Sequence, residues 1–390
     1  MAGVLARSWV ARVSLVYWAS RILSIGFMML FAVQQGPTPY TAGSPDYVTF
    51  ANFWDAHWFA YIASNGYPTT LPLDSSGYVT QNAWAFLPLY PAVVGGIATI
   101  LHLQWWTVSI VVSLLSGWAF MLVLYRLMRA HLNAEQSTWA VVFASVAPVS
   151  PLFGTGYAEP LGLLLLAVAL LMLTQRRYGM LALLLPLLAF TRPGAIAFAL
   201  TILIHGWLRW RERRRTTFPR RQRVAVALLA VWAGVLGVAW VVVAGVATGV
   251  PNAYLLTELS WRAAYIGQTE LAPGTAWFQA GKWWLGPMWG VVVPLLAVAA
   301  LVVLLFLRPT RRLGTDLRAW VASYGLYLFL VFFPQSSTLR ILAPMFPLAG
   351  VLAQIRSASV KILIAGLFIL GQLWWLYTSW IVIGSDWTPP

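Results

Sequence analysis

Long, uninterrupted apolar runs follow one another along this 390-residue chain, and they constrain its fold more than any other feature. Hydrophobic residues make up 60% of the sequence, far above the share in ordinary soluble domains. Several runs approach the roughly 20 residues that a helix needs to cross a bilayer. A transmembrane barrel would instead alternate apolar and polar residues. The sequence therefore predicts an all-α polytopic membrane protein.

The basic residues indicate how the chain threads the membrane. The formal net charge is +15, but the arginines lie in short loops between apolar runs, most densely in 209–223. Cytoplasmic loops of membrane proteins carry such an excess of arginine. The positive charge therefore indicates membrane topology, and we reject nucleic-acid binding as its explanation. We expect a single domain over 1–390 with about eleven spans in the plasma (inner) membrane. The expected spans are 10–33, 105–128, 137–153, 160–174, 179–191, 195–208, 224–247, 287–307, 319–333, 341–355 and 361–383.

Two long outer segments, 34–104 and 248–286, collect most of the acids in this arrangement, whereas 209–223 is the cytoplasmic Arg-rich loop. Residues 84–101 are apolar enough to cross, but a crossing would turn the later Arg-rich loops outward. We therefore place them as a re-entrant or interfacial piece of the outer segment. The clustering of acids predicts an active site on the extracytoplasmic face.

Asp55 is the first candidate for chemistry. It lies between Trp54 and Trp58 in a predicted short helix that Gly66 and Pro68 end. Trp54, Trp58, Tyr61 and Ile62 recur at helical spacing, which predicts an interfacial helix with this stripe buried. Asp55 fits a general base that takes a proton from a hydroxyl group. An exposed interfacial carboxylate or a helix cap is the alternative.

Arg192 and Arg340 stand at the outer ends of short spans, beside proline residues. A guanidinium binds phosphate with two hydrogen bonds, so both are candidates for phosphate recognition, unless they only anchor helix ends at the interface. Ser337 lies next to Arg340 in a run of hydroxyl residues. Glu159 could orient an arginine, bind substrate hydroxyls or form a structural salt bridge. Glu258 and Arg262 are one turn apart and predict a pair within one helix.

Other sequence features limit the metals and cofactors that the protein could use. His57 could contact a substrate, a metal or a lipid headgroup, and the remaining histidines show no ligand spacing. The sequence has no cysteine, so it offers no thiolate metal site. It also contains no Gly-rich phosphate loop and no His-Glu-x-x-His motif, so no nucleotide, metal or other cofactor is expected.

Several blocks, taken in order, resemble the PIG-V family, the second mannosyltransferases of glycosylphosphatidylinositol anchor assembly, which has bacterial relatives. The resemblance implies a GT-C glycosyltransferase that moves mannose from a polyprenyl-phosphate donor to a glycolipid or glycan acceptor, with Asp55 as base. The candidate substrate contacts are Trp54, His57, Trp58, Tyr90, Tyr157, Glu159 and Ser337. A lipid-linked sugar flippase and a non-catalytic envelope-assembly subunit remain alternatives. The matching blocks run from Trp54 to Tyr67, Phe86 to Pro91, Pro148 to Pro160, Thr191 to Gly194 and Ser337 to Pro347.

Overall fold

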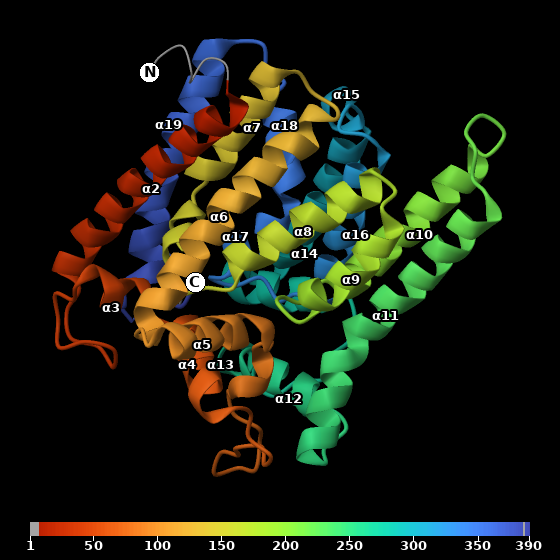
Figure 1. Cartoon of the computed structure of the whole chain (residues 1–390). Coiled ribbons are helices and arrows are strands. Elements are labelled where there is room, and N and C mark those ends of the chain that lie inside the picture. The colour runs from red at the N-terminus through yellow and green to blue at the C-terminus, as the bar shows by residue number, and fades with distance from the viewer. Residues whose placement is uncertain (1–7, 385–386) are drawn as a thin grey trace.

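Long apolar helices packed side by side form the body of the molecule (Figure 1). The computed structural model describes residues 8–384 and 387–390. Within these residues, five helices are long and apolar enough to cross a membrane, and the only β-type pairings are two isolated bridges. The predicted all-α membrane architecture is confirmed. The five are α2 (Trp9–Gln34), α6 (Trp105–Arg129), α11 (Arg220–Thr248), α14 (Ala276–Phe306) and α19 (Ala358–Trp375), which continues as a π-helical turn (Leu376–Trp380).

The other predicted spans coincide with shorter helical segments. Single helices among them have 12 to 17 residues, which is less than an upright helix needs to cross a bilayer. They are α7 (Ala134–Val146), α8 (Glu159–Thr174), α9 (Tyr178–Ala189), α10 (Ala195–Arg211) and α16 (Thr315–Val331). The predicted span 341–355 is broken into short segments, which are α17 (Thr338–Ile341), η3 (Ala343–Leu348) and α18 (Ala349–Leu352).

The largest difference from the predicted boundaries is in α14. This helix begins at Ala276, well before the predicted start at residue 287, and it is kinked at Gly286. Gly286 has φ 78°, a left-handed conformation that glycine adopts without steric cost, and Pro287 then opens the second half of the helix. The apolar residues before the kink therefore extend the helix in a new direction.

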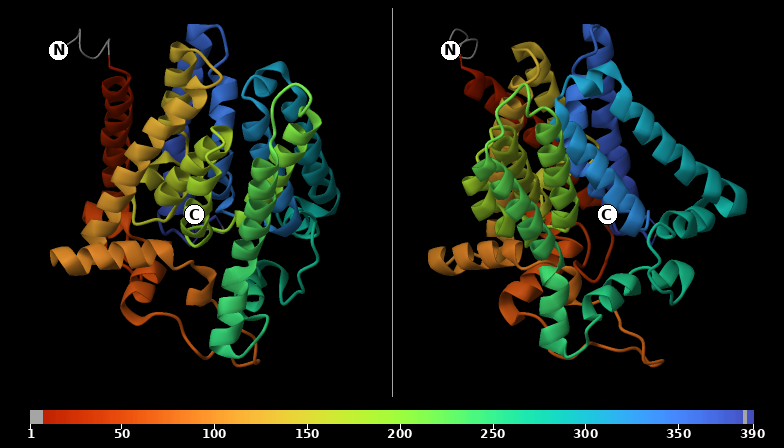
Figure 2. Two further views of the ribbon diagram at one scale, coloured as in Figure 1. Left: turned by 45° about the vertical axis from the view of Figure 1, so that its right-hand side comes forward. Right: turned by 90° about the vertical axis from the view of Figure 1, so that its right-hand side faces the viewer.

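The Arg-rich loop and the helices of the predicted outer segments lie at opposite ends of the bundle (Figures 1 and 2). The Arg-rich loop between α10 and α11, the short α15 (Arg308–Arg311) and the start of α19 lie together at one end. The opposite end carries α3 (Tyr47–Ala51), α4 (Asp55–Asn65), α5 (Leu89–Leu101), α12 (Ala253–Ser260) and α13 (Ala263–Ile266). The helices from the two predicted outer segments thus gather at the same end of the bundle.

Helix α5 comes from the segment whose membrane crossing the sequence left open. It has only 13 residues and lies across the end of the bundle rather than along the long helices (Figure 2). It ends at His102, whose φ of 54° is left-handed. This orientation suits an interfacial piece, which stays our prediction for residues 84–101.

A buried arginine fixes the chain that leads into the polar centre. Arg21 of α2 is 1% exposed and donates to the backbone oxygen of Ser145 at 2.6 Å and to that of Ser150. The Ser145 carbonyl lies in the last turn of α7, where helix geometry leaves acceptors without partners, and Ser150 begins η2 (Ser150–Gly154). Arg21 therefore ties α2 to the turn that carries Tyr157 and Glu159 toward the centre of the molecule.

Candidate active site

Asp55 occupies the first turn of α4 and is only 7% exposed. The preceding residue, Trp54, has φ 61° and donates from its indole nitrogen to the Trp380 carbonyl at 2.7 Å. The backbone nitrogen of Asp55 donates to the Tyr157 hydroxyl at 3.3 Å. Left-handed backbone at a non-glycine residue is costly and persists only where its surroundings fix it. Trp380 and Tyr157 thus hold the start of α4 and aim the Asp55 carboxylate inward.

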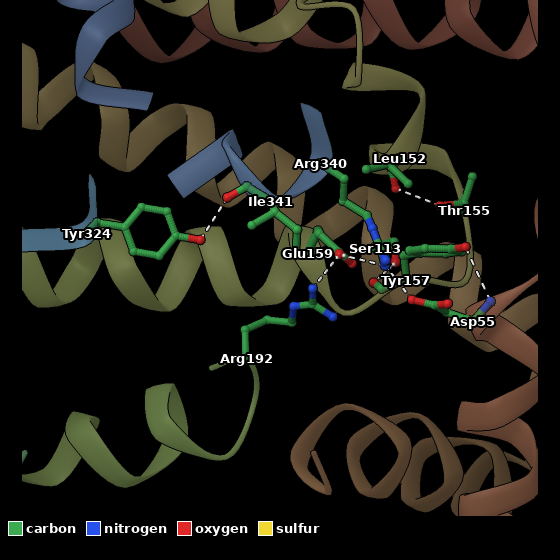
Figure 3. Close-up of polar contacts among 10 residues, drawn as sticks. All are labelled: Asp55, Ser113, Leu152, Thr155, Tyr157, Glu159, Arg192, Tyr324, Arg340 and Ile341. Carbon is green, nitrogen blue, oxygen red and sulfur yellow. Dashed lines mark hydrogen bonds and ion pairs between the residues drawn. The ribbon is translucent and has the colours of Figure 1, made fainter. Parts of the chain in front are cut away.

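Asp55 belongs to a network with two arginines and a second carboxylate (Figure 3). Nη1 of Arg340, from α17, contacts Asp55 Oδ2 and lies 3.1 Å from Glu159 Oε1. Nη2 of Arg192, from the turn between α9 and α10, is 3.1 Å from the same Glu159 oxygen. Segments far apart in sequence therefore converge on one chain of ion pairs, Asp55–Arg340–Glu159–Arg192.

The central arginine of this network is held as a cation. Burial alone would lower the pKa of Arg340, but the nearby Asp55 and Glu159 carboxylates outweigh burial and raise its pKa above the ordinary value. Its guanidinium also lies 5.3 Å from the centre of the Tyr157 ring. Among the described residues, Arg340 Nε and Glu159 Oε2 are buried without a hydrogen-bond partner. Such a desolvated network is expensive for a purely structural role, which marks the site as a functional candidate.

A cavity of about 260 Å³ opens beside this network. Asp55, Glu159, Arg192, Ser337 and Arg340 all contribute to its wall. The rest of the wall is largely aromatic and comes from η1 (Ala83–Ala85) and the following Phe86, from α12 and the residues after it, and from α16. The cavity therefore combines an ionic wall with an aromatic one, a common composition for small-molecule sites.

A second cavity of about 470 Å³ lies on the other side of Glu159 and is almost wholly apolar. Phe120, Phe143, Phe346 and Phe368 contribute to its wall, together with aliphatic residues of α8, α17 and α18. Glu159, Leu163 and Ala343 line both cavities. An apolar space thus adjoins the charged centre.

The structure brings together most of the candidates with ionisable side chains. Asp55, Glu159, Arg192 and Arg340 form one network, and Ser337 lines the same cavity. Glu159 pairs with both arginines, which fits both the predicted orienting role and the predicted structural salt bridge. Tyr157 is fully buried and supports Asp55 and Arg340 from below the cavity.

The other candidate substrate contacts lie outside the cavity wall. The Trp54 indole nitrogen donates a hydrogen bond to the Trp380 carbonyl, and His57 stacks on Tyr40 with ring centres 4.5 Å apart. Burial lowers the pKa of His57, which favours its neutral form. Trp58 stacks on the cavity residue Phe86 at 5.6 Å, and fully buried Tyr90 donates to the Ser109 carbonyl at 3.1 Å. These four positions support the helices around the site in this structure.

Two local expectations need correction. Tyr61 is 47% exposed, so the buried face of α4 is not the predicted tryptophan–tyrosine stripe but Asp55, Phe59 and Ile62. The reason is that α5 and η1 pack on α4 from that side.

Arg262 does not pair with Glu258: its Nη2 instead donates to the Val331 carbonyl at 2.6 Å.

The cavity wall also contains residues that the sequence did not identify as site candidates, among them Glu258, which was expected only to pair with Arg262. Tyr254, Glu258 and Trp261 face it from α12 and the turn that follows. The usable signal was their spacing, since positions i, i+4 and i+7 share one face of a helix. In the parts of the chain that the structure describes, no group of three histidine or acidic side chains is arranged to hold a metal ion.

Comparisons with known proteins add a fold-level likeness. No protein-family model and no curated protein sequence matches the chain. Its structure is similar to the archaeal oligosaccharyltransferase AglB from Archaeoglobus fulgidus in complex with an inhibitory peptide and a dolichol-phosphate, at 12% identity and a TM-score of 0.49, covering 96% of this chain and 55% of that one. A structure of the Archaeoglobus fulgidus oligosaccharyltransferase tethered with an acceptor peptide gives 12% identity, a TM-score of 0.38, and coverage of 96% and 56%.

The chain thus spans about half the length of these two oligosaccharyltransferases. At identities this low a likeness concerns the fold alone, and at these TM-scores it carries no argument about activity. The GT-C class and the PIG-V resemblance therefore belong to the proposal that follows.

Proposed function

We propose that this protein is a membrane glycosyltransferase of the GT-C class, related to the PIG-V family. In this proposal it moves mannose from a polyprenyl-phosphate donor to a glycolipid or glycan acceptor on the extracytoplasmic face of the plasma membrane. The observation that carries the proposal is the buried network of Asp55, Arg340, Glu159 and Arg192 on the wall of one cavity. It places a candidate base beside two candidate phosphate-binding groups.

The donor phosphate is assigned to Arg192 and Arg340. Arg192 uses Nη2 for Glu159, and its side chain is 24% exposed, so part of the guanidinium is open to a ligand. Arg340 has a buried Nε without a partner among the described residues. A phosphate that enters here competes with the carboxylates for these cations and gains charge-assisted hydrogen bonds in a poorly hydrated place.

The polyprenyl chain is assigned to the apolar cavity behind Glu159. This cavity adjoins the charged centre through Glu159, Leu163 and Ala343. A lipid phosphate has its charge at one end of a long apolar chain, so it needs an ionic site and an apolar site side by side. The two adjoining cavities meet this requirement.

In the proposed reaction an acceptor hydroxyl oxygen attacks the anomeric carbon of the donor sugar. The bond from that carbon to the phosphate oxygen breaks, and its electron pair leaves with polyprenyl phosphate. The hydroxyl proton passes to the Asp55 carboxylate, which the incoming phosphate has released from Arg340. The two arginines stabilise the charge that grows on the leaving phosphate. Attack opposite the leaving group inverts the anomeric centre, so a β-linked donor gives an α-linked product.

Product analysis tests this activity directly. The purified full-length protein is reconstituted in liposomes with bacterial membrane lipids and radiolabelled polyprenyl-phosphate mannose. The proposal expects the label to appear in a new lipid or glycan with the inverted linkage. Label that stays on the donor but changes leaflet would support flipping instead, and label that neither moves nor transfers would favour an assembly role.

A further inference from the structure

The aromatic wall of the active-site cavity contains a carboxylate that lacks an ionic partner. Glu258 lines the cavity from α12, and none of the ion pairs between described residues involves it. Arg262, one turn further on, is engaged by the Val331 carbonyl and lies over the Phe333 ring at 5.8 Å. The Tyr254 hydroxyl lies near Glu258 and lowers the pKa of its carboxyl. A half-buried carboxylate thus faces the cavity with acceptor capacity left.

An unused donor accompanies this acceptor. The indole nitrogen of Trp261 is buried and has no hydrogen-bond partner among the described residues, although its ring lines the cavity. The ring is fixed edge-on by Phe86 at 6.0 Å and by Trp58 at 6.3 Å. Buried polar groups in native proteins are nearly always paired, so an orphaned indole N–H in a cavity wall calls for a ligand.

The two groups have the chemistry of a sugar-binding site. A carboxylate can accept hydrogen bonds from two neighbouring hydroxyls, an indole N–H donates one, and an aromatic ring packs against the apolar face of a pyranose. A site built to hydrogen-bond hydroxyl groups also discriminates strongly, because a ligand that lacks them leaves its buried groups unpaired.

We propose that Glu258 and Trp261 form the subsite that holds the hydroxyl groups of the transferred sugar. This inference rests on the proposed glycosyltransferase function and adds where the sugar lies. In the donor the sugar is bonded directly to the phosphate, so its subsite must share a cavity with the phosphate-binding arginines. Glu258, Trp261, Arg192 and Arg340 do share one, and its volume of about 260 Å³ is that of a small-ligand site rather than of a long glycan groove.

The electrostatics agree with this placement. Burial raises the pKa of Glu258, and the nearby Tyr254 hydroxyl and the charges of Arg262 and Arg192 act against that increase. Glu258 therefore feels the charge of a phosphate-binding arginine, although the structure shows no direct contact between them. Two places in one cavity, one for the phosphate and one for the sugar, follow from this arrangement.

Binding of two ligands that differ only in the sugar tests the subsite. The affinities of the purified full-length protein for radiolabelled polyprenyl-phosphate mannose and for bare polyprenyl phosphate are measured without acceptor. We expect wild-type protein to bind the mannose-bearing lipid more tightly. Glu258→Gln and Trp261→Phe should each weaken that ligand by about tenfold and leave the affinity for bare polyprenyl phosphate unchanged, because only the sugar hydroxyls lose a partner.

Matched controls use the same chemical changes elsewhere. Glu270→Gln alters an exposed glutamate of the same outer segment, and Trp289→Phe alters an exposed tryptophan of α14. Both should bind the two lipids like wild type. The two test variants act on separate groups, so a folding defect in one leaves the other informative.

The remaining outcomes separate the two proposals. Test variants that bind both lipids like wild type would overturn the sugar subsite and leave the phosphate site intact. Test variants that lose affinity for both lipids equally would also overturn the sugar subsite, because the loss would not depend on the sugar. An unchanged donor affinity with a raised KM for the acceptor would also overturn it, because the subsite would then serve the other substrate. Wild-type protein that does not bind bare polyprenyl phosphate would instead contradict the proposed function.

Discussion

At the scale of single residues, Arg340 joins the two halves of the proposed chemistry. Its Nη1 meets both Asp55 and Glu159, and its pairing with Asp55 connects the candidate base to the phosphate site. A lysine has one point charge and cannot reproduce the planar fork of an arginine. This one side chain therefore pairs with both carboxylates at once.

Replacing Arg340 by lysine tests this dual role. We expect Arg340→Lys to lower kcat/KM for sugar transfer by roughly 10²–10³-fold, because one directed donor to the leaving phosphate is lost. Initial rates at varied donor concentration measure the effect. The matched control is Arg308→Lys, which changes an exposed arginine at the end of the bundle opposite the site. Equal rates for the two variants would show that a simple positive charge at position 340 is enough.

The stability of Glu258 variants gives an independent measurement. Burial raises the pKa of this carboxyl above 4.5, so the folded state binds its proton more strongly than the unfolded chain does. Stability is then highest at low pH and falls as the pH rises from the ordinary glutamate pKa through the raised one. Glutamine carries no charge and removes this loss. The charged and titratable groups around Glu258 are Tyr254, Arg262, Arg192, Asp55 and Tyr327.

We therefore expect Glu258→Gln to raise the melting temperature at a pH above the raised pKa, and the gain to shrink as the pH falls. Thermal unfolding of the purified protein across a pH series measures it, with Glu270→Gln as the control. A variant that is less stable than wild type at every pH would show that Glu258 serves the fold rather than a ligand.

At the scale of elements, the contact between α8 and the turn before α10 sets the position of Arg192. Gly162 lies one turn after Glu159 on α8, and a Cβ added to it would come within 2.9 Å of Arg192 Cγ. This is too close for real atoms, so the arginine side chain would have to shift away from Glu159. The glycine thus leaves room for the ion pair.

Adding one methyl group at this contact should disturb binding without damaging the bundle. We expect Gly162→Ala to weaken donor binding by roughly tenfold, because displacements near 1 Å are costly at catalytic sites. Gly179→Ala is the control, since no atom lies within 4 Å of the added Cβ in α9. Donor affinity equal to wild type in Gly162→Ala would mean that Arg192 does not bind the phosphate.

Helix positions could be predicted from the sequence because bilayer crossing imposes long apolar runs on it. The predicted helix starting near Asp55 and ending at Gly66 is confirmed. The site was harder to predict. Arg192, Arg340 and Glu159 were recognisable as rare charges near helix ends, but their shared contacts depend on packing between segments that are far apart in sequence. Glu258 was paired with Arg262 because the sequence cannot show that Val331 offers Arg262 a better partner.

At the scale of the whole molecule, the separation of charge between the two ends predicts its orientation. The Arg-rich loop lies at one end, and the helices that carry Asp55 and Glu258 lie at the other (Figure 1). Cytoplasmic loops carry the excess of arginine in membrane proteins. The proposed active site should therefore open toward the extracytoplasmic face.

Introduced cysteines can test this orientation, because the chain contains none of its own. Asn65→Cys at the end of α4 and His102→Cys at the end of α5 are exposed positions, as is Arg214→Cys in the Arg-rich loop. We expect a membrane-impermeant maleimide added to intact cells to label positions 65 and 102, and position 214 only after permeabilisation. Labels at 65 and 102 on opposite faces would mean that residues 84–101 cross the membrane. Labelling of 65 solely from the cytoplasm would reverse the proposed topology.

The sugar-transfer rate of the Asp55→Asn variant tests the role of Asp55 as the general base most directly. We expect folded Asp55→Asn protein still to bind the donor but to lose about 10²–10⁴-fold in turnover, because an amide cannot take the acceptor proton. Asp46→Asn, an exposed aspartate that caps α3, is the matched control and should transfer sugar at the wild-type rate. Near-full turnover by folded Asp55→Asn protein would contradict the role of Asp55 as the base.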